Sequence, residues 1–300
     1  MDEIPTVLAR TIVEVYGAAG AEWLGRLPAT IAECAQRWSL RVMPPFNILT
    51  YSYVAPAVGE DGKAAVLKAS VPSLELLGEI EALRYFNGHG SVKLLDADAE
   101  KGVLLLERLQ PGTLLSGIED DERATSIAAA VMRQLWRPLE TDHPFPTIGE
   151  QAQGLKKMRD HFGGGCGPFP RDLVEAAEAL FDQLIGSVSE PVLLHGDLHH
   201  GNILLSAERE SWLAIDPKGL LGEPEYEVGA MLRNPMPGLL AQPRPERILA
   251  RRLDQLSEEL DFDRERLVGW GLAQAVLAAW WSYEDHGRGW EPMIACAELF

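Results

Sequence analysis

The stretch LLHGDLHHGNILL, from Leu193 to Leu205, places a crowd of polar side chains between two apolar runs. A tight turn needs about one glycine and one asparagine, so the extra histidines and the aspartate require another explanation. Asn202 follows Asp197 by five positions, and Asp216 follows Asp197 by nineteen, in the segment SWLAIDP. Carboxylate and amide oxygens are the ligands that Mg²⁺ prefers in proteins. The block therefore predicts a catalytic loop with a magnesium site.

A strand, a turn near residues 207–210 and a second strand would bring the two ends of this block side by side. Lys68, upstream in the strand VLKAS, adds a fixed cation. On the helix that follows, Glu75 and Glu79 share one face while Glu81 is turned away, and Glu79 is the predicted partner of Lys68. Phosphoryl transfer needs such a set: a metal for the triphosphate, a cation on its α- and β-oxygens, and a carboxylate that orients the attacking hydroxyl.

The three histidines of the block, His195, His199 and His200, raise the alternative of a zinc site. Two glycines interrupt any helix that could carry these histidines, and the order H-E-x-x-H is absent. The spacing therefore disfavours zinc.

Carboxylates and tryptophans outside the block leave further alternatives open. Trp280 and Trp281 fit either helix packing or the wall of a substrate pocket. Glu284 and Asp285 fit either solvated carboxylates at a helix end or contacts to an amino or guanidino group of a substrate. Glu227, in EPEYEVG, is interpreted as a residue that caps or orients the metal-binding loop without doing chemistry itself.

The composition of the 300 residues narrows the class of protein. A hydrophobic content of 46% is enough for a sizeable core in one or two domains. A formal net charge of −18 argues against binding nucleic acid, although it is compatible with a cationic acceptor. No apolar run approaches the ~20 residues of a membrane span, so no membrane partner is expected. Three widely spaced cysteines without a C-x-x-C pair indicate a reducing compartment and predict a cytoplasmic location, whereas oligomeric state is not predicted.

Hydrophobic periodicity in the first third of the chain predicts a small β-rich lobe over residues 1–109, which begins with a helical extension and continues as a sheet with one central helix. The predicted elements are a helix over 5–38 with a helix start at Pro28, a hairpin over 49–70 that turns at Asp61-Gly62, a helix from 73 that ends at Asn87-Gly88, and a strand pair over 92–109. The segment QPGT at 110–113 breaks the pattern, and the domain boundary is placed there.

Residues 110–300 are predicted to form a larger, mainly helical lobe that carries the polar block. Its predicted helices lie at 120–137, 149–162, 171–187, 243–260 and 264–284. The fold class is therefore α+β, with a small β-rich lobe and a larger helical lobe.

The segments HGDLHHGNILL and AIDPKG resemble the signature of the aminoglycoside phosphotransferase family, which has the protein-kinase-like fold. The D-x-x-x-x-N spacing in the first segment equals that of the kinase catalytic loop. More narrowly, the chain is similar to the group of streptomycin 6-kinases and hydroxyurea-resistance kinases. This likeness extends over most of residues 20–235 and includes AEWLGRLPATIAECAQRWSL, SYVAPAV, AVLKAS, EIEALRYFNGHGSVKLLDAD, LLLERLQPGTLL and IDPKGLLGEPEYEVGAMLRNP.

For the larger lobe, the resemblance implies that Asp197 is the catalytic base or orients the acceptor hydroxyl. Asn202 and Asp216 would hold Mg²⁺. His195 would brace the loop, and His199 would lie beside the metal ligands.

For the smaller lobe, the resemblance implies that Lys68 contacts the α- and β-phosphates of ATP and that Glu79 pairs with Lys68. The backbone of Glu107, Arg108 and Leu109 would form the hinge that hydrogen-bonds adenine.

The expected phosphate-covering loop, RVMPPFNIL at residues 41–49, contains no glycine, although close backbone approach to phosphate usually needs one. The phosphates would then be covered more loosely, or by Asn47 and its neighbours. The implied function is transfer of the γ-phosphoryl group of ATP to a hydroxyl of a small molecule, with an aminoglycoside such as streptomycin, at its 6-hydroxyl, as the best acceptor. The alternatives are a kinase of a sugar, an amino alcohol or hydroxyurea, and a nucleotide-binding pseudokinase, which the glycine-free loop motivates.

Overall fold

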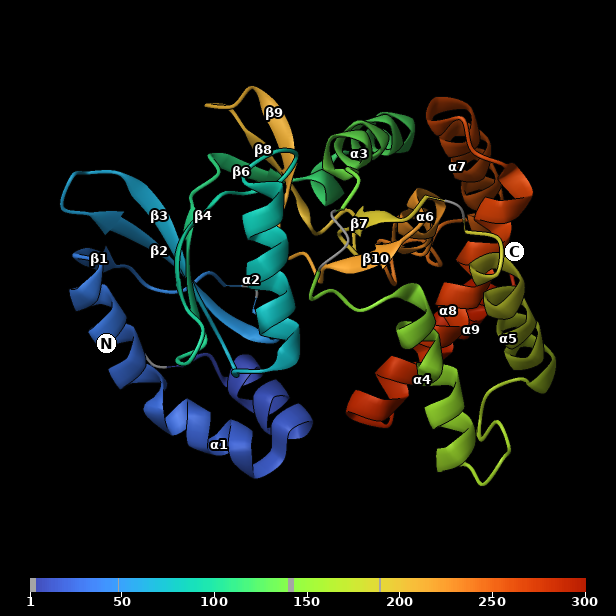
Figure 1. Cartoon of the computed structure of the whole chain (residues 1–300), viewed down its shortest axis with the longest axis horizontal. Helices are drawn as coiled ribbons and strands as arrows, with labels where there is room; N and C mark the ends of the chain where they lie inside the picture. Colours follow the sequence, from blue (N-terminus) through green and yellow to red (C-terminus); the bar gives the residue numbers. More distant parts are fainter. Residues whose placement is uncertain (1–3, 48, 140–142, 189) are drawn as a thin grey trace. The chain divides into compact units, whose positions relative to one another are not determined.

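The computed structural model describes residues 4–47, 49–139, 143–188 and 190–300. The chain divides into two compact units, the first ending at Gly112 and the second beginning at Thr113, and each has its own core. The first unit holds an antiparallel sheet and the second is mainly helical (Figure 1). The predicted α+β class is confirmed. Among the described residues, no helix combines the length and the apolar character needed to cross a membrane.

Five strands of the first unit lie in the order β1-β2-β3-β5-β4, each antiparallel to its neighbours. Their bounds are Leu40–Val42 (β1), Ser52–Gly59 (β2), Ala64–Ser70 (β3), Leu94–Asp98 (β4) and Val103–Glu107 (β5). The hairpin of β2 and β3 turns at the predicted position, where Gly62 adopts a φ of 80° and Lys63 N donates to Asp61 Oδ1 at 3.0 Å.

Alternation of side chains along β3 places two helices on opposite faces of this sheet. Leu67 and Ala69 are fully buried and join an apolar cluster with α1 (Thr6–Arg37). Lys68 lies between them in sequence, so it points to the other face. There its ammonium meets α2 (Leu74–Phe86).

Helix α1 corrects one prediction from the sequence. It continues through Pro28, where a helix start was expected, and its non-helical dihedrals lie at Gly17 instead (φ 56°, ψ −130°). A proline in a helix interior costs about 3 kcal/mol. Burial of Trp23, Leu27 and Ile31 on both sides of Pro28 offsets that cost.

Helix α2 begins and ends where the sequence predicts. Ser73 caps its start, since Leu76 N donates to Ser73 Oγ at 3.2 Å. Asn87 ends the helix in the left-handed conformation with a φ of 46°, and Gly88 follows with a φ of 78°.

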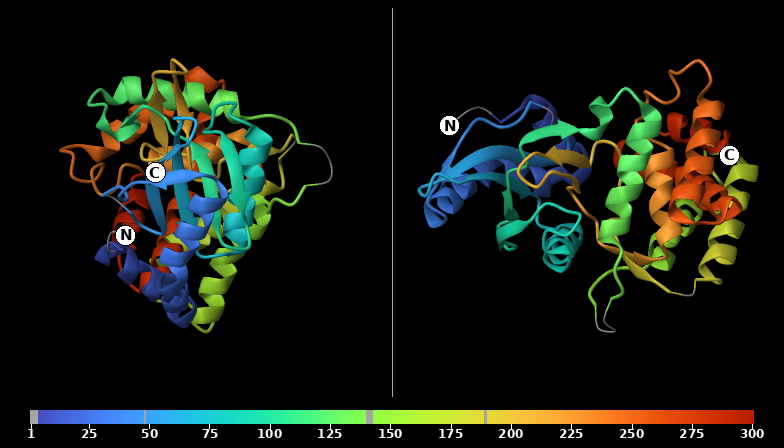
Figure 2. Two further views of the ribbon diagram at one scale, coloured as in Figure 1. Left: turned by 90° about the vertical axis from the view of Figure 1, so that its left-hand side faces the viewer. Right: turned by 90° about the horizontal axis from the view of Figure 1, so that it is seen from above.

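The five helices predicted in the second unit are present: α3 (Asp121–Leu135), α4 (Ile148–His161), α5 (Arg171–Ile185), α7 (Pro245–Leu260) and α8 (Arg264–His286). Two more helices, α6 (Pro224–Leu232) and α9 (Glu291–Ala297), were not predicted. The start signal of α6 was available in the sequence, because Pro224 is followed by two glutamates in the first turn. Helix α8 packs against α4, α5, α6, α7 and α9. Figure 2 shows the helices of this unit, coloured green to red, from two further sides.

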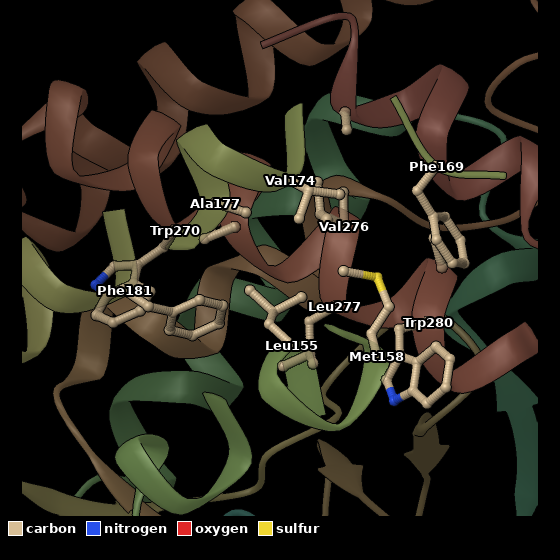
Figure 3. Packing of buried hydrophobic residues seen from close by; sticks show 14 of the residues in the cluster. Leu155, Met158, Phe169, Val174, Ala177, Phe181, Trp270, Val276, Leu277 and Trp280 are labelled. Carbon is tan, nitrogen blue, oxygen red and sulfur yellow. The ribbon is translucent and has the colours of Figure 1, made fainter. Parts of the chain in front are cut away.

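The core of the second unit joins α4, α5 and α8 (Figure 3). Helix α4 contributes Leu155 and Met158, α5 contributes Phe181, and α8 contributes Trp270 and Leu277. Each of these side chains is at most 2% exposed. This packing fixes α8 as a support for the elements that carry the polar block.

Two small sheets hold the polar block. Strand β8 (Ile203–Ser206) pairs with β9 (Ser211–Ala214) across the predicted turn, and β6 (Pro111–Leu114) lies on the other side of β8. Strand β7 (Val192–Leu194) pairs with β10 (Leu220–Gly222) in a separate sheet. The pairing of β8 with β9 across the turn follows the prediction, whereas the pairing of β7 with β10 in a separate sheet was not predicted. QPGT lies where the two units meet in sequence, and Pro111–Leu114 within and after it form β6, a strand that was not predicted.

Candidate active site

The two ends of the polar block are held together within the second unit. Ile215 N donates to Asn202 O at 2.9 Å, and the Nε2 atom of His195 lies 2.7 Å from Ile215 O. Asp197 lies between His195 and Asn202 in the loop, and Asp216 directly follows Ile215. The structure therefore brings the loop of Asp197 and Asn202 against the segment of Asp216.

His195 is a neutral brace for this loop. Its side chain is fully buried, and its Nδ1 accepts a hydrogen bond from Asp197 N at 3.3 Å. Nε2 therefore carries the hydrogen and donates it to Ile215 O. Burial lowers the pKa of His195 to about 4, so the ring is uncharged at neutral pH.

The turn at Gly196 requires glycine. Its φ is 85°, and a Cβ at this position would lie 3.2 Å from Lys218 Cβ and 3.3 Å from Leu220 Cβ. Gly196 N donates to Glu227 Oε1 at 3.0 Å, and His195 N donates to Glu227 Oε2 at 2.6 Å. Both bonds fix the backbone just before Asp197.

Glu227, on α6, is the anchor of these bonds and is only 1% exposed. Burial raises the pKa of Glu227 to about 7, and the N–H groups of His195, Gly196 and Leu198 act in the opposite direction. Since both carboxylate oxygens accept backbone hydrogen bonds, Glu227 orients the loop, as the sequence predicted.

Asp197 keeps a partly exposed side chain, at 31%. Its Oδ1 lies 3.3 Å from Arg233 Nη2, and its Oδ2 lies 3.8 Å from His199 Nε2. Arg233 is buried at the end of α6 and also donates from Nη1 to Gln274 Oε1, on α8, at 3.0 Å. Sequence reasoning missed Arg233 and Gln274, because separations of 36 and 41 residues between partners leave no periodic signal.

The two neighbouring histidines of the loop face different partners. Burial lowers the pKa of His199, and the negative charge of Asp197 opposes that shift. The Nδ1 atom of His199 accepts a hydrogen bond from Gly201 N at 3.0 Å. Burial also lowers the pKa of His200, to about 3, with a further contribution from the Arg252 guanidinium, which lies 3.4 Å from its Nε2. His199 thus lies beside Asp197, whereas His200 ties the loop to α7.

The residues predicted to hold Mg²⁺ present suitable donors. Asn202 Nδ2 donates to Asp197 O at 3.0 Å, which orients the amide so that its oxygen points away from that carbonyl. Asp216 has a φ of 66°, a left-handed conformation that aspartate tolerates better than most residues. One amide oxygen and one carboxylate in adjacent segments form the kind of hard-oxygen set that fits Mg²⁺.

In the first unit, Lys68 and Glu79 form the predicted ion pair. Lys68 Nζ donates to Glu79 Oε1 at 2.7 Å and to Glu79 Oε2 at 2.8 Å. The two side chains are only 8% and 9% exposed. Glu81, on the same helix, pairs with Arg84 instead, as its position on the other face predicts. An ammonium group is therefore held inside the first unit at a fixed position.

The three predicted hinge residues follow one another where β5 ends. Glu107 is the last residue of β5, and Arg108 and Leu109 come directly after it. Glu107 N donates to Lys93 O at 3.0 Å, and Glu107 Oε1 accepts from Lys93 N at 2.8 Å. Both the backbone N–H and the carboxylate of Glu107 are thus engaged with Lys93 inside the first unit.

The glycine-free segment at 41–49 continues beside β2. Met43 N donates to Pro56 O at 2.8 Å, and Phe46 N donates to Val54 O at 2.9 Å. Both N–H groups therefore donate to carbonyl oxygens of β2. The prediction that Asn47 and its neighbours cover phosphate includes position 48, which lies outside the described residues.

The alternatives for the tryptophans of α8 are resolved in part. Trp280 is 2% exposed and belongs to the core of the second unit (Figure 3), as helix packing predicts. Trp280 also lines a groove of about 440 Å³. The groove is lined by Lys157, Asp160, His161, Trp280, Tyr283 and Glu284.

These features define a class of protein: a small-molecule kinase with a sheet unit that fixes a lysine and a helical unit that carries an aspartate loop beside an asparagine and a second aspartate. The family model described as aminoglycoside/hydroxyurea antibiotic resistance kinase matches residues 38–286, and the chain belongs to this family. The expected resemblance is confirmed.

Two relatives extend the likeness over nearly the whole chain. A streptomycin 6-kinase of Streptomyces glaucescens is 35% identical over 300 residues, covering 97% of this chain and 94% of the relative. A hydroxyurea phosphotransferase of Kitasatospora aureofaciens is 37% identical over 285 residues, covering 94% of this chain and 81% of the relative.

Solved structures confirm the kinase-like fold. A thermostable mutant aminoglycoside phosphotransferase in a ternary complex with ADP and hygromycin B has a TM-score of 0.63 at 14% identity, covering 89% of this chain and 97% of that chain. A choline kinase from Streptococcus pneumoniae has a TM-score of 0.62 at 13% identity, with coverages of 92% and 100%. At these identities the likeness shows the fold alone.

Proposed function

We propose that this kinase transfers the γ-phosphoryl group of ATP to the 6-hydroxyl of streptomycin, with Mg²⁺ as the metal. The observation that carries the proposal is the loop of Asp197 and Asn202, held by backbone hydrogen bonds against the segment of Asp216. Relatives named for streptomycin 6-phosphorylation align with 97% of the chain and support this acceptor. The net charge of −18 suits a cationic acceptor but does not select one.

In this proposal the second unit positions the acceptor and the metal. Asp197 accepts a hydrogen bond from the acceptor hydroxyl and aligns its oxygen for attack, because its side chain is partly exposed and its loop is fixed by His195. Asn202 and Asp216 hold Mg²⁺, which, when bound, neutralises charge on the phosphates.

The first unit binds the nucleotide. Lys68, oriented by Glu79, contacts the α- and β-phosphates, and its ammonium is already fixed by two short hydrogen bonds. The backbone of Glu107, Arg108 and Leu109 hydrogen-bonds adenine. A cytoplasmic location, with Cys34, Cys166 and Cys296 free and buried, belongs to the same proposal.

The test is a transfer assay with purified protein, ATP, Mg²⁺ and streptomycin, in which NMR of the product locates the phosphate. We expect phosphate at the 6-hydroxyl, and Asp197→Ala should lower kcat by about 10²–10⁴-fold. Asp182→Ala, at an exposed aspartate on α5, is the matched control and should leave kcat unchanged. Full activity in Asp197→Ala would contradict the role of that carboxylate.

A second acceptor, hydroxyurea, is favoured by the relative with 37% identity. Hydroxyurea offers an N-hydroxyl group, which the same aspartate could align. The assay is run on both compounds, and transfer to hydroxyurea without transfer to streptomycin selects this acceptor. Phosphate at the 3″ position of streptomycin would instead match the streptomycin 3″-kinase of Klebsiella pneumoniae, which is 30% identical over 261 residues.

A further inference from the structure

The two terminal nitrogens of the Arg233 guanidinium contact different residues. Its Nη2 lies 3.3 Å from Asp197 Oδ1, and its Nη1 donates to Gln274 Oε1 at 3.0 Å. Arg233 is 6% exposed and Gln274 is 4% exposed, so both polar groups lie where water does not replace a lost partner. The direction in which Arg233 presents its charge to Asp197 therefore depends on Gln274.

Gln274 is itself fixed on the other side. Its Nε2 donates to the carbonyl of Tyr226, on α6, while its Oε1 accepts from Arg233. Turning the amide over would place its NH₂ group against the guanidinium and its oxygen against the carbonyl oxygen, so only one orientation satisfies both contacts. The amide thus acts as a rigid link between α8 and the end of α6.

The backbone of α6 is shaped to admit this link. Gly229 lies directly beneath the amide, and a Cβ at this position would lie 2.5 Å from Gln274 Cδ. Real Cβ atoms do not approach other atoms so closely, so any larger residue would displace Gln274. The need for glycine here follows from the approach of α8 and not from a turn.

We infer that Gln274 is a positioning residue for Asp197 and acts through Arg233. It holds the guanidinium so that Arg233 Nη2 stays against Asp197 Oδ1. The side chain of Asp197 is thereby kept in one rotamer, in which its Oδ2 lies 3.8 Å from His199 Nε2. The inference rests on the proposed role of Asp197 in aligning the acceptor hydroxyl. Displacing a reacting group by about 1 Å can cost 10²-fold in rate, so a link remote from the substrate is enough to affect turnover.

The experiment compares Gln274→Met, Arg233→Met and the double variant in the streptomycin transfer assay. Methionine keeps the length of glutamine but cannot accept from Arg233. We expect Gln274→Met to lower kcat about tenfold or more with an unchanged KM for ATP. In the Arg233→Met background, Gln274→Met should cause no further loss of kcat, because no guanidinium remains for Gln274 to hold against Asp197.

Two further variants separate positioning from folding. Gln255→Met, at a glutamine that joins α7 to α3 through Glu122 O and Ser126 Oγ, makes the same chemical change away from Asp197 and should keep kcat. Gln274→Glu retains an oxygen acceptor for Arg233 and nearly the same volume, but it loses the N–H that donates to the Tyr226 carbonyl, so it should recover only part of the kcat lost in Gln274→Met. It also serves as the test if Gln274→Met does not fold.

The outcomes distinguish this inference from the proposed function. If the wild type transfers phosphate to no acceptor, or Asp197→Ala keeps its activity, the proposed function fails. If the wild type is active and Asp197→Ala is not, but Gln274→Met keeps kcat, the inference alone is overturned. Equal losses of kcat from Gln274→Met in the presence and absence of Arg233 also overturn it.

Discussion

The buried pair of Lys68 and Glu79 allows a prediction that separates stability from chemistry. Removing one partner, as in Glu79→Gln, leaves the Lys68 ammonium in a site where the two side chains are only 8% and 9% exposed. Breaking a buried ion pair in this way costs about 3–5 kcal/mol, because the remaining charge loses the carboxylate that offsets its desolvation. Unfolding free energies of ~5–15 kcal/mol are usual, so the variant should remain folded and measurable.

The double variant Lys68→Met with Glu79→Leu should lose far less. Replacing both charges with apolar side chains of similar volume removes the Coulomb attraction and the desolvation penalty together, which is often neutral to within ~1 kcal/mol. The measurement is urea denaturation of the wild type, both single variants and the double variant. We expect a coupling free energy of at least about 2 kcal/mol. The double variant should nevertheless transfer no phosphate, since the ammonium proposed to contact ATP is gone.

The matched control is an exposed pair of the same residue types in the same unit. Lys101 Nζ lies 2.6 Å from Glu33 Oε2, but these side chains are 41% and 61% exposed. Lys101→Met should therefore change the free energy of unfolding by less than about 1 kcal/mol. If Glu79→Gln costs no more than Lys101→Met, or if the losses from the two single changes at the buried pair simply add, the reasoning from burial is refuted.

Gly196→Ala should lower the free energy of unfolding by about 2 kcal/mol and reduce kcat, since the φ of 85° and the contacts at 3.2 and 3.3 Å both oppose a Cβ. Gly62→Ala is the control: its φ is 80°, but among the described residues other than its two chain neighbours no atom lies within 4 Å of a Cβ there, so it should cost only about 1 kcal/mol and keep kcat. Equal effects of the two substitutions would refute the contact argument. Acidification should destabilise the protein through His195 and His200, because burial in the folded state lowers their pKa values from 6.5 to about 4 and about 3. Below pH 6.5 these histidines therefore bind protons in the unfolded state but not in the folded state. Glu227, with a pKa raised from 4.5 to about 7, binds a proton in the folded state between pH 4.5 and 7 and opposes them, so the net loss from these three groups is about 1.4 kcal/mol per pH unit between pH 6.5 and 4.5. Glu227→Gln removes the opposing proton and should steepen that slope to about 2.7 kcal/mol per pH unit in urea denaturation at several pH values, whereas an unchanged slope would show that Glu227 titrates normally.

Local signals in the sequence were sufficient wherever a short segment carries its own periodicity or cap. The long helices of the second unit, the hairpin of β2 and β3 and the end of α2 at Asn87 were all predicted from such signals. The same holds for the pair of Lys68 and Glu79, because alternation on a strand and the spacing on the next helix together fix which side chains can meet.

The sequence failed where an element is short or where packing overrides propensity. Strands β7 and β10 have three residues each, too few to show an alternation, and their pairing joins segments on either side of the polar block. Pro28 stays inside α1 because the side chains around it are buried, a fact that no local rule contains. The poor helix propensity of proline predicts a helix boundary at Pro28, but burial of the side chains around it keeps the helix continuous there.

The sequence by itself determined which groups are proposed to do chemistry, since the residue types and spacing of Asp197, Asn202 and Asp216 are local properties of one block. Only the tertiary structure decided how Asp197 is held: Arg233 and Gln274 lie on two later helices and reach it through contacts across 36 and 41 residues. The physical reason is that the chemistry of a side chain is set by its own atoms. Its orientation is set by buried partners, and these are chosen by the packing of α6 against α8.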